Sequence, residues 1–147
     1  MLDLEIATTG RRWQADLAAP LDLAIRLQFP GPQPRYFATE PARAAPLRAG
    51  SFSGSVADGA SCNCNEFSLA PHCHGTHTEC VGHVTDNAVA VAALTPVPPV
   101  PPALAALVTE LAYVPDGLYL LALHVPAFDA DAAPSRPVLY PVTEAAP

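Results

Sequence analysis

The sequence predicts an α/β fold that is mostly β, in a single domain over residues 1–147. Three observations predict it. Apolar and polar residues alternate along several segments, with the period of a strand that buries one face. Proline-rich segments at residues 30–46 and 95–102 can be neither helix interior nor central strand. Only residues 103–111 resemble a helix, and that helix would be short. A chain of this length suits one domain with a real core.

The N-terminal residues are expected to form strands. Residues 2–6 alternate apolar and acidic side chains, residues 8–10 provide a turn, and residues 12–17 can return along the first segment. That arrangement predicts a β-hairpin at a sheet edge. Residues 21–29 alternate most clearly of all, with leucine, isoleucine and phenylalanine on one face, and they predict a further strand.

The loop predicted for residues 30–46 carries two aromatic side chains, Tyr36 and Phe37. Two interpretations of this pair stay open. The two rings could form one wall of a substrate pocket, or they could simply cover a sheet edge, because most aromatic side chains in loops are packing groups.

Shorter elements follow in the rest of the chain. Residues 51–56 and 66–70 predict two short strands around a turn, and the second leads directly into the histidine-rich segment 71–83. Residues 88–94 are apolar and fit either a buried strand or a short helix. Residues 118–125 predict an apolar strand near the end of the chain.

The segment 71–83 is the densest group of potential metal ligands, with four of the five histidines and two of the four cysteines. Alternate side chains of an extended chain share a face. The residues that would line one side are Cys73, His77, Glu79 and His83. Gly75 can turn the chain over, so this alternation is firm only from Thr76 onward. Zinc accepts imidazole, thiolate and carboxylate together, and a hydrolytic site needs about three protein ligands plus an open position for water.

The same segment resembles a known family motif. Gly75-Thr76-His77-Thr78-Glu79 followed by His83 is similar to the signature His-x-Gly-Thr-His-x-Asp-x-Pro-x-His of the metal-dependent cyclase family, which includes the bacterial kynurenine formamidases. Three positions depart from that signature. Cys73 stands in the register of the first histidine, Glu79 replaces the aspartate and Val81 replaces the proline.

The resemblance implies the swivelling β/β/α architecture of that family and a homodimer. It extends to residues 109–121 and 132–140, which look like the closing strands of one cyclase subgroup. The proline-rich spacer at residues 95–102 stands where relatives carry an additional segment with another metal-binding histidine. In this alignment Glu110 takes the place of the late metal-binding glutamate, whereas a lone glutamate is otherwise most often a solvated charge.

The resemblance also implies an activity. The chain would be a metal-dependent amide hydrolase of the arylformamidase type, converting N-formylkynurenine, a small-molecule substrate, into kynurenine and formate. The implied metal is zinc, one or two per chain, with manganese as a substitute. The implied ligands are His77, Glu79, Glu110 and either Cys73 or His72. The metal would make water a nucleophile near neutral pH, and His83 would act as general base and then as acid.

Two other functions stay open beside the hydrolase. The first is a catalytically impaired member of the family that still binds metal or an aromatic ligand. The second is a structural zinc domain built from the cysteines, for which the Cys62-x-Cys64 spacing is unlike the usual zinc knuckle. We expect Cys62, Cys64 and Cys80 to be small buried hydrophobes near the site. His124 either replaces the lost histidine ligand or is a hydrogen-bonded core or edge residue.

Composition excludes some classes of partner. The net charge is −7 and the seven basic residues, all arginines, are scattered, so nucleic acid is not an expected partner. No uninterrupted apolar run reaches the roughly 18 residues that span a bilayer, so no membrane association is expected. The first residues lack the basic start and apolar core of a signal peptide, and the cysteine pattern suits a reducing compartment, so we expect a cytoplasmic location.

Overall fold

The computed structural model describes residues 3–8, 11–86, 89–94, 103–108 and 113–145. The chain divides into two compact units, and each is described by itself. Unit 1 comprises Met1–Ala24 and Thr76–Pro147, and unit 2 comprises Ile25–Gly75. In both units strands outnumber helices among the described residues, which confirms a mostly β composition. The cyclase-like architecture and the single domain over residues 1–147 stay predictions.

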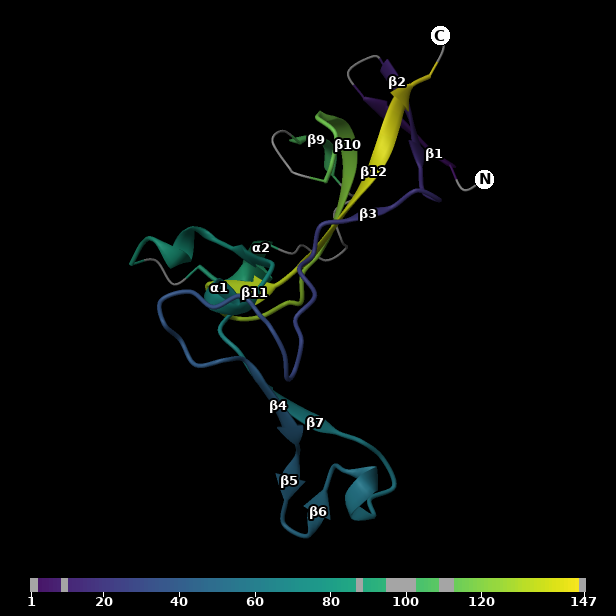
Figure 1. The fold of residues 1–147 in the computed structure, drawn as a ribbon. Coiled ribbons are helices and arrows are strands. Elements are labelled where there is room, and N and C mark those ends of the chain that lie inside the picture. The colour runs from purple at the N-terminus through teal and green to yellow at the C-terminus, as the bar shows by residue number, and fades with distance from the viewer. Residues whose placement is uncertain (1–2, 9–10, 87–88, 95–102, 109–112, 146–147) are drawn as a thin grey trace. The chain divides into compact units, whose positions relative to one another are not determined.

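Unit 1 contains the larger sheet, in which all described pairs are antiparallel. The strand order is β1-β2-β12-β10-β9, and β3 pairs with β12 off this path (Figure 1). The bounds are Asp3–Thr8 for β1, Arg11–Asp16 for β2, Leu21–Asp22 for β3, Ala103–Val108 for β9, Gly117–His124 for β10 and Arg136–Glu144 for β12. The long strand β12 pairs first with β10 and then with β2, so it joins the N-terminal hairpin to the rest of the sheet.

The N-terminal part of the sheet confirms one prediction and corrects another. Strands β1 and β2 pair antiparallel as the predicted hairpin. The strand predicted for residues 21–29 is wrong beyond Asp22, because β3 ends there. The Asp22 carboxylate accepts a hydrogen bond from the amide of Ala24 at 3.0 Å. A hydrogen bond of this local kind competes with the hydrogen bonds that a strand makes to its neighbour. The strand therefore ends, although the apolar alternation of the sequence goes on.

The helix predicted for residues 103–111 is also wrong over residues 103–108, the part of it that the structure describes. Residues 103–108 form strand β9, which pairs with β10 from Gly117↔Val108 to Leu121↔Ala103 with an irregularity beside Tyr119. Alanine and leucine favour helix locally, but pairing along an apolar partner strand outweighs that weak preference. The strand predicted for residues 118–125 is confirmed by β10. The spacer at residues 95–102 and Glu110 lie outside the described residues.

The core of unit 1 lies mainly on β10 and β12. One cluster joins Val114, Tyr119 and Leu139, with Leu21, Leu23 and Leu121 packed against it. The hydroxyl of Tyr119 donates to the carbonyl oxygen of Pro115 at 2.8 Å, so the polar end of this buried ring is satisfied. A second cluster joins Cys80, Val91 and Ala133, with Val89 and Val125 against it.

The second cluster supports a small sheet that carries the histidine-rich segment. Strand β8, His77–Glu79, pairs antiparallel with β11, Ala132–Pro134. Helix α2, Val91–Leu94, confirms the helical alternative for residues 88–94. The amide of Val91 donates to the carbonyl of Ala130 at 2.7 Å, which ties α2 to the chain just before β11. None of the helices in the described part of the chain is long and apolar enough to cross a bilayer.

Unit 2 is built from two small two-stranded sheets and short helices. Strand β4, Arg43–Pro46, pairs with β7, Asn65–Ser68, and β5, Arg48–Ala49, pairs with β6, Phe52–Ser53. A 3-10 turn η1, Val56–Asp58, and helix α1, Pro71–His74, complete the unit. Both strands predicted here are therefore shorter than expected. A side chain at Gly54 would collide with the carbonyl oxygen of Cys64, so only glycine permits this close approach of two backbones.

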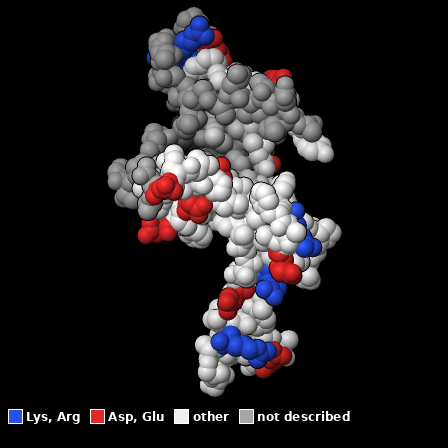
Figure 2. Space-filling model, turned by 90° about the vertical axis from the view of Figure 1, so that its left-hand side faces the viewer, with Lys and Arg blue, Asp and Glu red and all other residues white. Residues whose placement is uncertain are grey.

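Charged side chains of both signs lie near one another on the face that Figure 2 shows. Within unit 1, Arg11 lies 3.6 Å from Glu144, and within unit 2, Arg48 lies 3.7 Å from Asp58. These pairs are exposed to solvent, so each adds little to stability. The expectation that nucleic acid is not a partner stays a prediction.

Candidate metal centre

Strand β8 positions the first two candidate ligands. It is held by β11 through the pairs Ala132↔Glu79 and Pro134↔His77, and the amide of Ser135 donates to the carbonyl of Thr76 at 3.1 Å. Side chains two residues apart on a strand point to the same face. Accordingly, Nε2 of His77 lies 3.7 Å from Oε2 of Glu79, as the sequence predicts.

The third candidate, His83, reaches the same carboxylate by a turn rather than by an extended strand. After Cys80 the chain forms the 3-10 helix η2, Val81–His83, in which the amide of His83 donates to the Cys80 carbonyl at 3.0 Å. In an extended segment the Cα atoms of Glu79 and His83 would be about 13 Å apart. The turn shortens this separation, and Nε2 of His83 lies 3.9 Å from Oε2 of Glu79. The extended geometry predicted from Glu79 to His83 is therefore wrong, and a turn brings the two side chains together.

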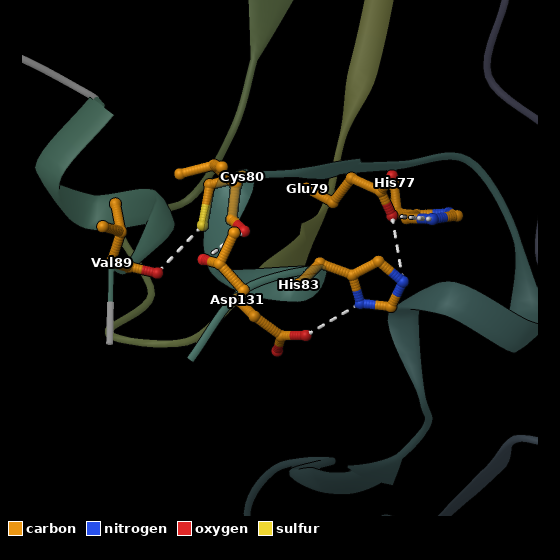
Figure 3. Close-up of polar contacts among 8 residues, drawn as sticks. His77, Glu79, Cys80, His83, Val89 and Asp131 are labelled. Atoms are coloured by element: carbon orange, nitrogen blue, oxygen red, sulfur yellow. Dashed lines mark hydrogen bonds and ion pairs between the residues drawn. The ribbon is translucent and has the colours of Figure 1, made fainter. Parts of the chain in front are cut away.

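The Glu79 carboxylate therefore faces two imidazoles, as Figure 3 shows. Separations of 3.7 and 3.9 Å exceed the length of a hydrogen bond, about 2.7–3.2 Å. They are closer to the spacing of about 3.4 Å between neighbouring ligands that lie about 2.0–2.1 Å from a tetrahedral zinc ion. The chemistry of this donor set, imidazole with carboxylate, also suits zinc.

The described residues include a group of histidine and carboxylate side chains that could hold a metal ion; Glu79 and His83 belong to it, and His77 does not. The side chains of His77, Glu79 and His83 are 26%, 49% and 39% exposed. This partial exposure lets water and a small molecule reach the carboxylate and both rings. The identity and number of metal ions, zinc or manganese, stay predictions.

Sequence reasoning missed a fourth polar residue, Asp131. Its Oδ2 lies 3.2 Å from Nδ1 of His83, within hydrogen-bonding range (Figure 3). Asp131 is 48 residues later in the chain, and no local motif marks it. Only the pairing of β11 with β8 brings it to the site, because Ala132, the next residue, is the partner of Glu79.

Cys80 connects this site to the core. Its side chain is buried, and its thiol donates to the carbonyl oxygen of Val89 at 2.9 Å. Its amide donates to the carbonyl of Asp131 at 3.0 Å. Cys80 therefore confirms the prediction of a buried cysteine near the site. The same prediction is wrong for Cys62, which is exposed. Cys64 is half-buried, so it fits the prediction only in part.

Helix α1 in unit 2 corrects the extended path predicted from Cys73. Pro71 suits the first turn of a helix, because its missing amide proton needs no partner there. The buried side chain of His74 then holds the helix in place. The amide of Ala70 donates to Nδ1 of His74 at 2.9 Å, and Nε2 donates to the carbonyl of Glu40 at 2.8 Å. This histidine uses both ring nitrogens in structural bonds.

The remaining candidate residues are placed as follows. Cys73 is buried and His72 half-buried, both on α1 of unit 2, and metal ligation by either stays a prediction. Tyr36 and Phe37 of unit 2 are 62% and 90% exposed, so Phe37 covers no sheet edge, and the pocket wall stays a prediction. His124 is exposed at the end of β10.

No group of three potential ligands that could hold a metal ion in the described residues contains a cysteine. No family model matches the chain, and no curated protein or solved structure is significantly similar to it. The resemblance to the metal-dependent cyclases therefore depends on the sequence motif, and the site's function is inferred from its geometry.

Proposed function

We propose that this chain is a metal-dependent hydrolase that cleaves an amide bond, of the arylformamidase type, with N-formylkynurenine as substrate. The observation that carries the proposal is the convergence of two imidazoles, from His77 and His83, on the Glu79 carboxylate. The side chains of His77, Glu79 and His83 are partly exposed to solvent, whereas His74, whose ring makes two structural hydrogen bonds, is buried.

His77 and Glu79 would hold the metal, since they share one face of β8 and a backbone held by β11. When bound, a zinc ion at this place would polarise a carbonyl group and make water acidic enough to react near neutral pH. The contribution of Glu79 is a negative charge that favours a cation, and that of His77 is a neutral nitrogen ligand.

His83 would move the proton. Hydrolysis adds the oxygen of water to the formyl carbon, breaks the bond between that carbon and the amide nitrogen, and transfers a proton to the departing amine. His83 stands beside the Glu79 carboxylate but on η2, after β8 has ended, so it can accept the proton of water and then donate it to the amine.

The test is the variant His83→Ala, with His124→Ala as the matched control. His124 is an exposed histidine of the same unit at the end of β10. We expect His83→Ala to lower kcat for N-formylkynurenine by about 100- to 10,000-fold and to keep the metal content of the unaltered chain. The control should keep both the activity and the metal.

Two outcomes would contradict the proposal. If His83→Ala loses the metal together with activity, His83 is a ligand and not the proton carrier. If the unaltered chain binds metal but does not release formate from N-formylkynurenine, it is a metal-binding protein without this hydrolytic activity.

A further inference from the structure

Asp131 is held beside His83 by the backbone and not only by its side chain. Its carbonyl accepts the amide of Cys80 at 3.0 Å, and the next residue, Ala132, pairs with Glu79. Cys80 itself is anchored in the core by its buried thiol. The carboxylate of Asp131 is therefore placed against the turn that carries His83 (Figure 3).

The contact between His83 and the Asp131 carboxylate determines which ring nitrogen carries the proton. A neutral imidazole has one proton to share between its two nitrogens, and the hydrogen bond that one nitrogen makes selects the tautomer. Oδ2 of Asp131 lies 3.2 Å from Nδ1 of His83. An ionised carboxylate only accepts hydrogen bonds, so Nδ1 is the nitrogen that carries the proton and donates it to Asp131. In the neutral ring the lone pair is then on Nε2.

We propose that Asp131 is a positioning residue, which holds His83 in the Nδ1–H tautomer with Nε2 directed at the reacting water. This inference rests on the proposed function of His83. Asp131 does not itself take up the proton that His83 removes from water. Its negative charge stabilises the imidazolium that forms during the step and keeps the ring in one orientation. Replacing an orienting partner of this kind typically lowers metal affinity or activity by about 10- to 100-fold.

The experiment compares Asp131→Asn and Asp131→Ala with Asp129→Asn in the full chain. Asp129 is an exposed carboxylate two residues earlier in the same loop, so its variant controls for the change in charge. The first measurement is the nitrogen-15 NMR spectrum of the histidine rings, without metal and at about pH 9, which is above the ordinary pKa of imidazole. The His83→Ala variant assigns the signals of His83.

We expect Nδ1 of His83 to be protonated in the unaltered chain and in Asp129→Asn. Asp131→Ala and Asp131→Asn should both lose this preference. With zinc and N-formylkynurenine, both Asp131 variants should lower kcat by about 10- to 100-fold and leave KM unchanged. A variant that only disturbed the fold would change the spectra of the other histidines too, including the buried His74.

The inference is wrong if His83 keeps the same tautomer in both Asp131 variants, or if those variants keep full kcat while the unaltered chain is active. If the unaltered chain releases no formate, the proposed function fails. In that case the NMR measurement of the His83 tautomer still tests whether Asp131 positions the ring, because it does not depend on activity.

Discussion

Nε2 of His77 and Oε2 of Glu79 lie 3.7 Å apart on one face of β8. The same carboxylate oxygen is 3.9 Å from Nε2 of His83, so Glu79 is the residue that the two rings share. A cation placed among these atoms would depend most on this one negative charge. Glu79 is for that reason the most informative position for testing whether the chain binds metal.

We expect Glu79→Gln to weaken zinc binding by more than the about 10- to 100-fold that follows the loss of a merely orienting group. The glutamine has the same size but no negative charge. The measurement is a competition titration against a coloured chelator, with Glu144→Gln, an exposed position of β12, as the control. Equal zinc affinity in Glu79→Gln and the unaltered chain would show that this carboxylate is not a ligand.

His74 should be essential to the stability of unit 2 rather than to activity. Its ring joins the amide of Ala70 to the carbonyl of Glu40, and the side chain is only 4% exposed. His74→Ala leaves both backbone groups without this partner, and because both hydrogen bonds are only partly buried, the cost should be less than the about 1–3 kcal/mol of a fully buried unsatisfied group. Hydrogen exchange should accelerate within residues 25–75.

The control for that experiment is His124→Ala, because His124 is exposed on the sheet of unit 1. Fluorescence is unsuitable as the main measurement, since the single tryptophan, Trp13, belongs to unit 1. Unchanged exchange of the Ala70 amide in His74→Ala would contradict the proposed structural role of the ring.

The ion pair between Arg136 and Asp22 should make stability depend on pH. Arg136 donates from Nε and Nη2 to Oδ2 of Asp22 at 2.9 and 2.7 Å. That bond, and secondly the amide of Ala24, lower the pKa of Asp22 below its usual value of 3.8. A pKa that is lower in the folded chain contributes stability above the unfolded value, and this contribution is lost as pH falls through the folded value.

We therefore expect the unaltered chain to be more stable than Asp22→Asn at neutral pH, and this difference to shrink below about pH 4. Urea unfolding followed by Trp13 fluorescence at several pH values measures it. Asp129→Asn serves as the control and should show no such narrowing. A difference between Asp22→Asn and the unaltered chain that is independent of pH would contradict the role of this pair.

Strand β10 offers a test of where the core of unit 1 lies. Leu120 is 2% exposed, whereas Leu123 on the same strand is 46% exposed. Leu120→Ala should lower the free energy of unfolding by about 2–5 kcal/mol, because it removes buried methyl groups and leaves a cavity. Leu123→Ala should cost clearly less. Urea unfolding measures both, and equal losses would place the core elsewhere.

Local patterns predicted the parts of the fold in which neighbouring residues decide the structure. The hairpin of β1 and β2 follows from apolar alternation and turn residues, and the strand β10 follows from a run of apolar residues. The failures are residues 23–29 and, within the described part of the chain, residues 103–108. In the first, a side-chain bond from Asp22 interrupts an alternating pattern, and in the second, pairing with β10 overrides helix preference.

The candidate site divides in the same way. The shared face of His77 and Glu79 could be predicted from the sequence, because side chains two positions apart on a strand point the same way. The other contacts depend on how distant segments pack together. The turn η2 brings His83 to Glu79, and the pairing of β11 with β8 delivers Asp131 from 48 residues away. Contacts between distant segments depend on strand pairing and burial along the whole chain, and these cannot be predicted from the local spacing of residues.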